Sequence, residues 1–195
     1  MADRPHLVLA SGSPRRMELL ARLRLHPEQR PADIDEAPLP DEDAYTLVIR
    51  LAGTKASVSA RTDDEVVLAA DTVVVYGGRI LGKPHDADEA ASMLARLSGR
   101  THEVITGIAV RRGATHLTDA VTTRVTFRSL SMADIAWYVS TREPHDKAGA
   151  YGLQGAGAVL VERIDGCDTN VIGLPLPHTV ALLREVGFEP LDPSA

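Results

Sequence analysis

A carboxylate inside an apolar run is the first feature of this sequence that could do chemistry. Asp71 lies in VVLAADTVVVY, residues 66–76, next to Thr72 and with apolar residues on both sides of the pair. Burying an ionised carboxylate is costly unless it is paired or binds a metal, and neighbouring side chains of a strand face opposite ways. The pattern favours a general base or a metal ligand at Asp71. The alternative is a strand end at which Asp71 meets solvent.

Two adjacent arginines stand at the start of an expected helix. In LVLASGSPRRMELLARL, residues 7–23, an apolar strand leads into a serine cap and a proline that begin the helix. The free N–H groups and the positive dipole end of a helix start favour an anion such as phosphate. The side chains that could join them are Ser11, Ser13, Arg15 and Arg16. An ordinary capped surface helix with two solvated arginines fits the same residues.

Two lysines could add positive charge to such a site. Lys55 falls beside the apolar stripe of an expected helix over residues 41–60, and Lys83 follows a glycine turn in the tripeptide Gly-Lys-Pro. Each lysine alone is compatible with a surface side chain whose stem lies along apolar neighbours. Together with the arginines, they supply the several cations that a triphosphate needs.

The glycine-rich segment DKAGAYGLQGAG, residues 146–157, could surround a ligand. Its glycine spacing differs from that of a dinucleotide-binding fingerprint, and a strand follows it instead of a helix. As a loop, it would let Gln154 present amide donors and an acceptor to the edge of a base. A flexible connection without a ligand is the alternative.

Acidic side chains in the loop PADIDEAP, residues 31–38, could hold a hard cation such as Mg²⁺. They are Asp33, Asp35 and Glu36, although acids in loops are usually solvated. The 7 histidines have no spacing that would predict a zinc site, and Cys167 has no evident activating partner. A metal interpretation therefore depends on carboxylates.

The composition excludes several classes of protein. The chain has 27 acidic and 21 basic residues and a formal net charge of -6, which does not fit a polynucleotide binder. The single cysteine cannot form an intramolecular disulfide and fits a reducing compartment. The N-terminal apolar run is too short for a signal peptide, and no stretch approaches the ~20 apolar residues that span a bilayer. We therefore expect a soluble, cytoplasmic protein with neither a membrane nor a polynucleotide partner.

The hydrophobic periodicity predicts strands that alternate with helices. Strands are expected over residues 7–10, 65–76, 102–111, 117–127 and 159–164. Helices are expected over residues 14–23, 41–60, 86–99, 132–140 and 176–186. Residues 26–40 and 149–157 are expected to be mostly loop, and Gly77-Gly78 a hairpin turn. Because some neighbouring strands form hairpins, the sheet should be mixed, in one domain or in one domain with two lobes.

In combination, these motifs resemble the Maf family of nucleoside triphosphate pyrophosphatases. The matching segments occur in order along nearly the whole chain: LASGSPRRMELL, the region of Lys55, AADTVV, LGKP, LSGRTHEVITGIAV, VTFRSL, EPHDKAGAYGLQG and IGLPL. The resemblance implies an α/β fold in which residues 1–195 form a single domain of two lobes, with an elongated mixed β-sheet flanked by helices. The active-site cleft would lie between the lobes, as in inosine-triphosphatase-like folds.

The resemblance also implies a reaction, that of a hydrolase acting on acid anhydrides. Members hydrolyse a nucleoside triphosphate between its α- and β-phosphates with a divalent cation, Mg²⁺ or Mn²⁺, and release the monophosphate and pyrophosphate. The position of Asp71 is the proposed proton acceptor in such proteins, and the positions of Arg15, Thr72 and Gln154 are associated with the choice of base. Their combination here is similar to the branch that acts on dTTP and UTP. The sister branch, which prefers a methylated guanine nucleotide, typically carries an aromatic residue in place of Arg15.

The expected mechanism assigns a role to each candidate residue. Phosphate binding falls to Ser11, Ser13, Arg15, Arg16, Lys55 and Lys83, base recognition to Thr72 and Gln154, and the divalent cation to Asp71 and Glu36. Asp71, or a water that it orients, would start the attack. A homodimer is compatible with the resemblance. The other interpretations are an enzyme that removes non-standard nucleotides, a nucleotide-binding regulator of septum formation with little turnover, and a phosphate-binding module.

Overall fold

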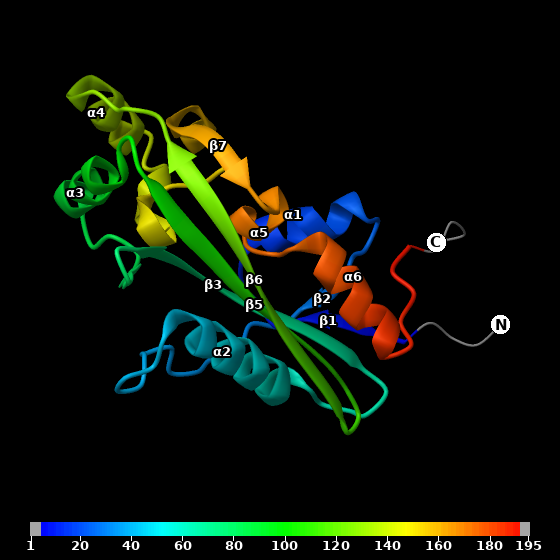
Figure 1. The fold of residues 1–195 in the computed structure, drawn as a ribbon. Coiled ribbons are helices and arrows are strands. Elements are labelled where there is room, and N and C mark those ends of the chain that lie inside the picture. The colour runs from blue at the N-terminus through cyan, green and yellow to red at the C-terminus, as the bar shows by residue number, and fades with distance from the viewer. Residues whose placement is uncertain (1–4, 192–195) are drawn as a thin grey trace. The chain divides into compact units, whose positions relative to one another are not determined.

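The computed structural model describes residues 5–191, and these residues contain a mixed β-sheet (Figure 1). The strands are β1 (Leu7–Leu9), β2 (Glu28–Gln29), β3 (Val66–Tyr76), β4 (Arg79–Leu81), β5 (Thr101–Arg112), β6 (Thr115–Phe127) and β7 (Val161–Asp165). In this part of the chain, the seven strands have the order β2-β1-β3-β5-β6-β7, with β4 paired to β3. Strand β1 is parallel to β2 and β3, whereas the β3–β4 and β6–β7 pairs are antiparallel. The predicted mixed sheet is confirmed.

Helices accompany the strands, as the periodicity predicts. They are α1 (Pro14–Arg22), α2 (Ala44–Ser59), α3 (Ala87–Leu97), α4 (Met132–Ser140), α5 (Asp168–Ile172) and α6 (Leu176–Glu185). Three short 3₁₀ turns, η1 (Glu143–Asp146), η2 (Ala148–Ala150) and η3 (Ala156–Leu160), lie before and at the two ends of the expected loop over residues 149–157, and residues 151–155 lie between η2 and η3. None of the helices in the described part of the chain has both the length and the apolar character that crossing a membrane requires.

The chain divides into two compact units. The first contains the residues up to Asp71, residues 106–121 and those from Gly173 onward, and the second contains residues 72–105 and 122–172. Strands β3, β5 and β6 each contribute residues to both units. The single domain with a cleft between two lobes stays a prediction.

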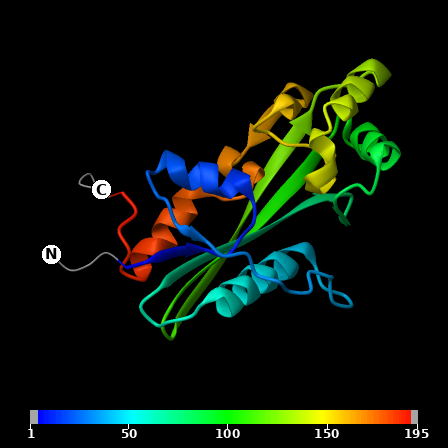
Figure 2. The same ribbon diagram turned by 180° about the vertical axis from the view of Figure 1, so that it is seen from behind.

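In the first unit, α2 lies on one face of the sheet, and α1 and α6 lie on the other (Figures 1 and 2). Small and β-branched side chains form the core between α2 and the strands: Val8, Ala10, Ala52, Ala56, Val67, Ala69 and Ala109. Gly107 on β5 lies so close to the backbone of Val48 on α2 that a side chain there would collide with it. Small residues therefore allow the helix to pack directly on the strands.

The second unit contains the β3–β4 hairpin and the helices α3 and α4, which pack against each other (Figure 1). Gly77 and Gly78 join the two strands with φ values of 58° and 73°, the left-handed conformation of a tight two-residue hairpin turn. Asp86 caps the start of α3, while Ser131 and Asp134 form a reciprocal capping box at the start of α4. These local signals explain why the predicted hairpin and both helices are confirmed.

Helix α5 has no counterpart among the expected elements. Its five residues are too few to show a helical periodicity. The buried Asn170 instead holds this helix, because its amide donates hydrogen bonds to the Val104 carbonyl at 3.0 Å and to Thr123 Oγ1 at 2.9 Å. The element thus depends on contacts between residues that are far apart in the sequence.

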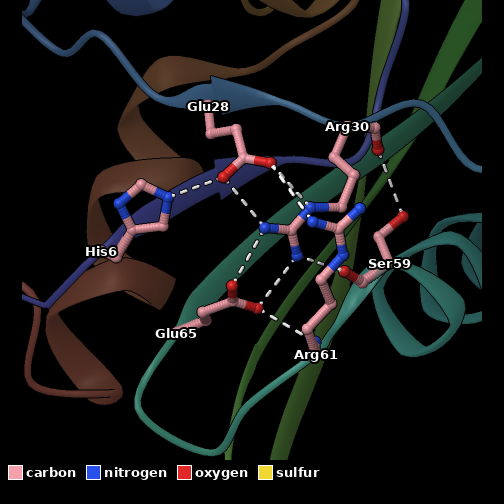
Figure 3. Close-up of polar contacts among 6 residues, drawn as sticks. All are labelled: His6, Glu28, Arg30, Ser59, Arg61 and Glu65. Carbon is pink, nitrogen blue, oxygen red and sulfur yellow. Dashed lines mark hydrogen bonds and ion pairs between the residues drawn. The ribbon is translucent and has the colours of Figure 1, made fainter.

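The edge strand β2 lies in a segment that was expected to be a loop. Arg30 follows this strand, and its guanidinium donates to Glu28 at 3.0 Å, to Glu65 at 3.0 Å and to the Ser59 carbonyl at 2.7 Å (Figure 3). These contacts tie β2 to the end of α2 and to the start of β3. The guanidinium lowers the pKa of both Glu28 and Glu65 to about 2.

Replacing Arg30 should weaken the fold in a pH-dependent way. The pKa of Glu28 and Glu65 falls from an ordinary 4.5 to about 2 in the folded chain, so their stabilisation is complete above pH 4.5 and is lost as the pH falls towards 2. Urea titrations should therefore find the largest difference in unfolding free energy between wild type and Arg30→Met at neutral pH. The difference should shrink below pH 4.5.

The control for this experiment is Arg184→Met, which removes an exposed ion pair with Glu189. Exposed pairs contribute little to stability, so this variant should resemble wild type at each pH. A cost of Arg30→Met that did not change with pH would contradict the electrostatic interpretation.

The close packing of α2 gives a second prediction, about Gly107. Gly107→Ala should destabilise the chain by about 1–3 kcal/mol, because the added methyl group forces α2 away from β5. Gly53→Ala on α2 is the matched control: its Cβ would meet His116 at 3.6 Å, an ordinary contact. Alanine favours a helix over glycine by about 0.5–1 kcal/mol. Thermal unfolding should find a lower Tm for Gly107→Ala and a higher Tm for Gly53→Ala, and equal Tm values would refute the close approach.

Candidate active site

Asp71 and Lys55 form a nearly buried ion pair in the first unit. Lys55 Nζ lies 2.7 Å from Asp71 Oδ1, and only 12% of the Asp71 side chain and 9% of the Lys55 side chain are exposed. Asp71 therefore does not end its strand in solvent, and Lys55 is not a solvated surface lysine. Both of these alternatives are wrong. Each charge is favourable at this depth because the other is present.

The register of α2 and β3 brings these two side chains together. On β3, Val67 and Ala69 pack against α2, and Asp71 continues this alternation on the same face. On α2, Leu51 is buried, and Lys55 lies four residues further on along the same side of the helix. The meeting of the carboxylate and the ammonium follows from the two periodicities.

Glu36 joins this pair from the loop after β2. Its Oε1 is 2.6 Å from Lys55 Nζ, although 54% of the Glu36 side chain is exposed. The other two acids of that loop, Asp33 and Asp35, are exposed, and Asp35 accepts a hydrogen bond from the backbone N–H of Ala37 at 2.9 Å. The ammonium of Lys55 thus lies between two carboxylates.

Arg16 is fixed near the start of α1 by two hydrogen bonds. Its Nη1 donates to Ser11 Oγ at 2.9 Å, and its Nε donates to the Gly173 carbonyl at 2.9 Å. Burial lowers the pKa of Arg16, whereas the negative charges of Asp71 and Glu36 raise it, so this guanidinium interacts electrostatically with both carboxylates. The first unit therefore combines a buried acid with cations from α1 and α2.

The helix start also places the predicted serines. Ser13 occupies the cap position before Pro14, as predicted, but its side chain makes no capping hydrogen bond. Its backbone N–H donates to Ser11 Oγ at 3.2 Å. Ser11 is buried and Arg15 is half-buried. Their contact with phosphate stays a prediction.

The remaining candidates, Thr72, Lys83 and Gln154, belong to the second unit. Thr72 is half-buried on β3, and Lys83 is exposed after β4. The Gly82 carbonyl accepts a hydrogen bond from the N–H of Gly149 at 3.0 Å, which ties the turn of Lys83 to the segment that carries Gln154. Gln154 itself is half-buried in that segment. Ligand contact by these three side chains stays a prediction.

Comparison with known proteins identifies the family. The model of the Maf-like protein family matches residues 6–186. The chain belongs to the Maf family. A protein of Anaeromyxobacter dehalogenans (strain 2CP-1) named dTTP/UTP pyrophosphatase is 54% identical to it, over 94% of this chain and 95% of the relative. A protein of the same name from Myxococcus xanthus is 54% identical over 96% and 95% of the two chains.

More distant proteins are similar over comparable lengths. A dTTP/UTP pyrophosphatase of Escherichia coli O157:H7 is 49% identical over 91% of each chain. A solved structure of a nucleoside-triphosphatase / dITP/XTP pyrophosphatase from Mycobacterium abscessus covers 97% of this Maf chain and 98% of its own, with 14% identity and a TM-score of 0.44. At that TM-score the likeness supports no conclusion, and the fold class rests on the mixed sheet and its helices.

Two groups near Ser11 and Arg16 could not be identified as part of the site from the sequence. Gln29 Nε2 donates to the Ser11 carbonyl at 2.8 Å, and the Gly173 carbonyl accepts from Arg16. Gln29 lies on β2, which sequence periodicity did not predict. A backbone carbonyl such as that of Gly173 is present at every residue, so its role can be found only in the structure.

The carboxylates of Asp71 and Glu36 fit a divalent cation that also binds phosphate. Both contact the ammonium of Lys55, at 2.7 and 2.6 Å, so the two carboxylates lie close to each other. Residues 5–191 contain no group of three or more histidine, cysteine, aspartate or glutamate side chains arranged for a metal. Mg²⁺ is commonly held by one or two carboxylates together with substrate phosphates, and this donor set matches that pattern.

Removing the ammonium should leave the buried Asp71 carboxylate without its contact with Lys55. Lys55→Met keeps the length and the apolar stem of the side chain, yet it should cost about 3–5 kcal/mol at neutral pH, as breaking a buried pair does. The double variant Lys55→Met/Asp71→Asn should recover most of this loss, because no buried charge remains unpaired.

The measurement is the unfolding free energy of the four chains of this double-mutant cycle in urea. Glu36→Gln serves as the control and should cost less than Lys55→Met, because the Glu36 side chain is largely exposed. The buried ion pair is disproved if the two single substitutions at positions 55 and 71 have additive costs.

Proposed function

We propose that this Maf chain hydrolyses dTTP and UTP to the nucleoside monophosphate and pyrophosphate. The observation that carries the proposal is the buried Asp71 carboxylate, paired with Lys55 and in electrostatic contact with Arg16. Relatives named dTTP/UTP pyrophosphatase are 54% identical over nearly the whole chain, which supports the choice of substrate. An acid held among cations suits the attack of water on a polyphosphate.

The triphosphate would bind at the start of α1. Arg15 and Arg16 offer guanidinium groups that match phosphate oxygens, and the free N–H groups of the helix start add to their attraction. The hydrogen bonds from Arg16 to Ser11 and Gly173 hold its side chain before the substrate arrives. Such preorganised charge stabilises the transition state of phosphoryl transfer without reorganisation.

Asp71 would accept the proton of the water that attacks the α-phosphorus. The bond between this phosphorus and the oxygen bridging to the β-phosphorus breaks, and pyrophosphate leaves with the electron pair. A divalent cation, Mg²⁺ or Mn²⁺, held by Asp71 and Glu36 would supply positive charge to the phosphate oxygens. Lys55 contacts the two carboxylates at 2.7 and 2.6 Å and would hold them in position, while its contact with the phosphates stays a prediction.

The second unit would provide base recognition. The amide of Gln154 offers two donors and one acceptor, which suit the polar edge of uracil or thymine, and Thr72 adds a hydroxyl. Lys83 would contribute a further cation for the phosphates. A homodimer and a cytoplasmic location complete the proposal, and neither follows from the geometry of the site.

The first test is a substrate panel with released pyrophosphate and orthophosphate measured separately. The purified chain with Mg²⁺ should release pyrophosphate mainly from dTTP and UTP, and far less from CTP, GTP and ATP. Pyrophosphate released mainly from a modified nucleotide would keep the reaction and refute base recognition by Thr72 and Gln154. Tight binding without turnover would favour the regulatory interpretation instead.

The role of Asp71 as the general base can be tested by substitution. Asp71→Asn should lower kcat by at least about 100-fold, the usual contribution of a general base. Asp64→Asn, at an exposed position shortly before β3, is the matched control and should keep wild-type kcat. Near-normal turnover by Asp71→Asn, with both variants folded by circular dichroism, would remove Asp71 from the mechanism.

A further inference from the structure

The segment that carries Gln154 is held by backbone hydrogen bonds on both sides of this residue. Before it, the N–H of Gly152 donates to Tyr138 Oη at 3.1 Å. After it, the N–H of Ala156 donates to Glu143 Oε1 at 2.8 Å, and the N–H of Gly157 donates to Glu143 Oε2 at 3.3 Å. Two side chains thus accept three N–H groups from six consecutive residues.

The two acceptors are themselves linked. Tyr138 Oη donates to Glu143 Oε2 at 3.2 Å, and the Tyr138 side chain is fully buried in the core of the second unit. Burial raises the pKa of Tyr138, so its hydroxyl keeps its proton and remains a donor to Glu143. We call Tyr138 and Glu143 the loop clamp.

Two glycines allow the backbone to approach the loop clamp, and a third lies against Lys147. A Cβ at Gly157 would lie 2.6 Å from Tyr138 Oη, and a Cβ at Gly155 would collide with the Glu143 carboxylate. At Gly152, a Cβ would lie 2.6 Å from Cε of Lys147, whose ammonium donates to the Glu143 carbonyl at 2.7 Å. Gly155 and Gly157 therefore provide the space that the loop clamp needs.

A second contact fixes the chain just before the segment. Tyr151 Oη lies 2.8 Å from Nε2 of the buried His102, and the Tyr151 ring packs edge-on against Phe127. Burial lowers the pKa of His102 to about 4, so the imidazole is neutral at neutral pH. Tyr151, which directly precedes the segment of Gln154, is therefore held in place by its contacts with His102 and Phe127.

We infer that Glu143 and Tyr138 are positioning residues that determine base selectivity through Gln154. The inference rests on the proposed function, in which the Gln154 amide contacts the base. A glutamine distinguishes bases only if its amide is held at a defined distance from their polar edge, and its backbone must be fixed for that. The loop clamp performs this task for a residue that lies in the turn between η2 and η3.

The test compares the kcat/KM of dTTP with that of GTP for each variant. Tyr138→Phe removes a single hydroxyl, and Glu143→Ala removes both acceptor oxygens. Loss of such hydrogen bonds should lower the dTTP:GTP ratio by about tenfold in Glu143→Ala and less in Tyr138→Phe, mainly through the KM for dTTP. Glu162→Ala, which removes an exposed carboxylate on β7, is the matched control and should keep the wild-type ratio.

A double variant separates positioning from a general loss of structure. In the background of Gln154→Ala, Glu143→Ala should no longer change the dTTP:GTP ratio, because the side chain through which it acts is gone. A structural defect would instead lower kcat/KM for both nucleotides by the same factor. If Glu143→Ala does not fold, Tyr138→Phe in the same two backgrounds decides the question.

The outcomes distinguish this inference from the proposed function. If Gln154→Ala lowers the ratio while Glu143→Ala and Tyr138→Phe leave it unchanged, the proposed function stands and the loop clamp is refuted. If wild type shows no preference for dTTP, or Gln154→Ala keeps that preference, base recognition by Gln154 fails and the inference fails with it. A lowered ratio in the clamp variants that disappears without Gln154 supports the inference.

Discussion

The ion pair between Lys55 and Asp71 is the interaction on which the candidate site depends. Two charges at this depth are stable only in contact with opposite charge: without Lys55, Asp71 would lose this ion pair, and without Asp71, Lys55 would keep the largely exposed Glu36. Their meeting requires α2 to lie directly on the sheet, and this close packing requires the small residues of the core, among them Gly107 on β5, where a side chain would collide with the backbone of α2. The alanine-rich interior of the first unit is therefore a condition of the electrostatics as well as of the packing.

In the second unit, buried polar groups also need partners, and here the groups are backbone N–H donors. The turn that carries Gln154 has no strand partner for its N–H groups, and a backbone donor without an acceptor is costly when it is buried. Glu143 and Tyr138 supply the acceptors, and the glycines supply the space. An irregular segment can thus be as well defined as a strand, provided that side chains accept the hydrogen bonds that a neighbouring strand would otherwise accept.

The sequence predicts those parts of the fold whose signals are local. The long periodic elements and the Gly77-Gly78 turn are each encoded within a few residues, and the structure confirms them. Strand β2 and helix α5 could not be predicted, because the contacts of Arg30 and Asn170 join distant segments. Both elements are also too short to show a period.

In the candidate site, too, the residues with local signals could be predicted and those that depend on distant contacts could not. Asp71 stands out because a carboxylate in an apolar strand is chemically anomalous, and its pairing with Lys55 can be derived from the periods of one strand and one helix. Glu36 could not be placed beside them, because acids in loops are usually solvated and the path of a loop is not periodic. The contacts of Glu143 could not be predicted for a different reason: its partners are backbone N–H groups, which nearly every residue has, so no residue type indicates them.

The charge distribution bears on the choice between an enzyme and a simple binder of anions. A net charge of -6 would repel a triphosphate, so the attraction must come from a local group of cations. A binder would gain nothing from a carboxylate within that group, because like charges repel. Asp71 nevertheless lies there, at a cost that Lys55 offsets through a contact of 2.7 Å. A reaction that needs a proton acceptor or a cation ligand at the phosphate accounts for the aspartate, and binding alone does not.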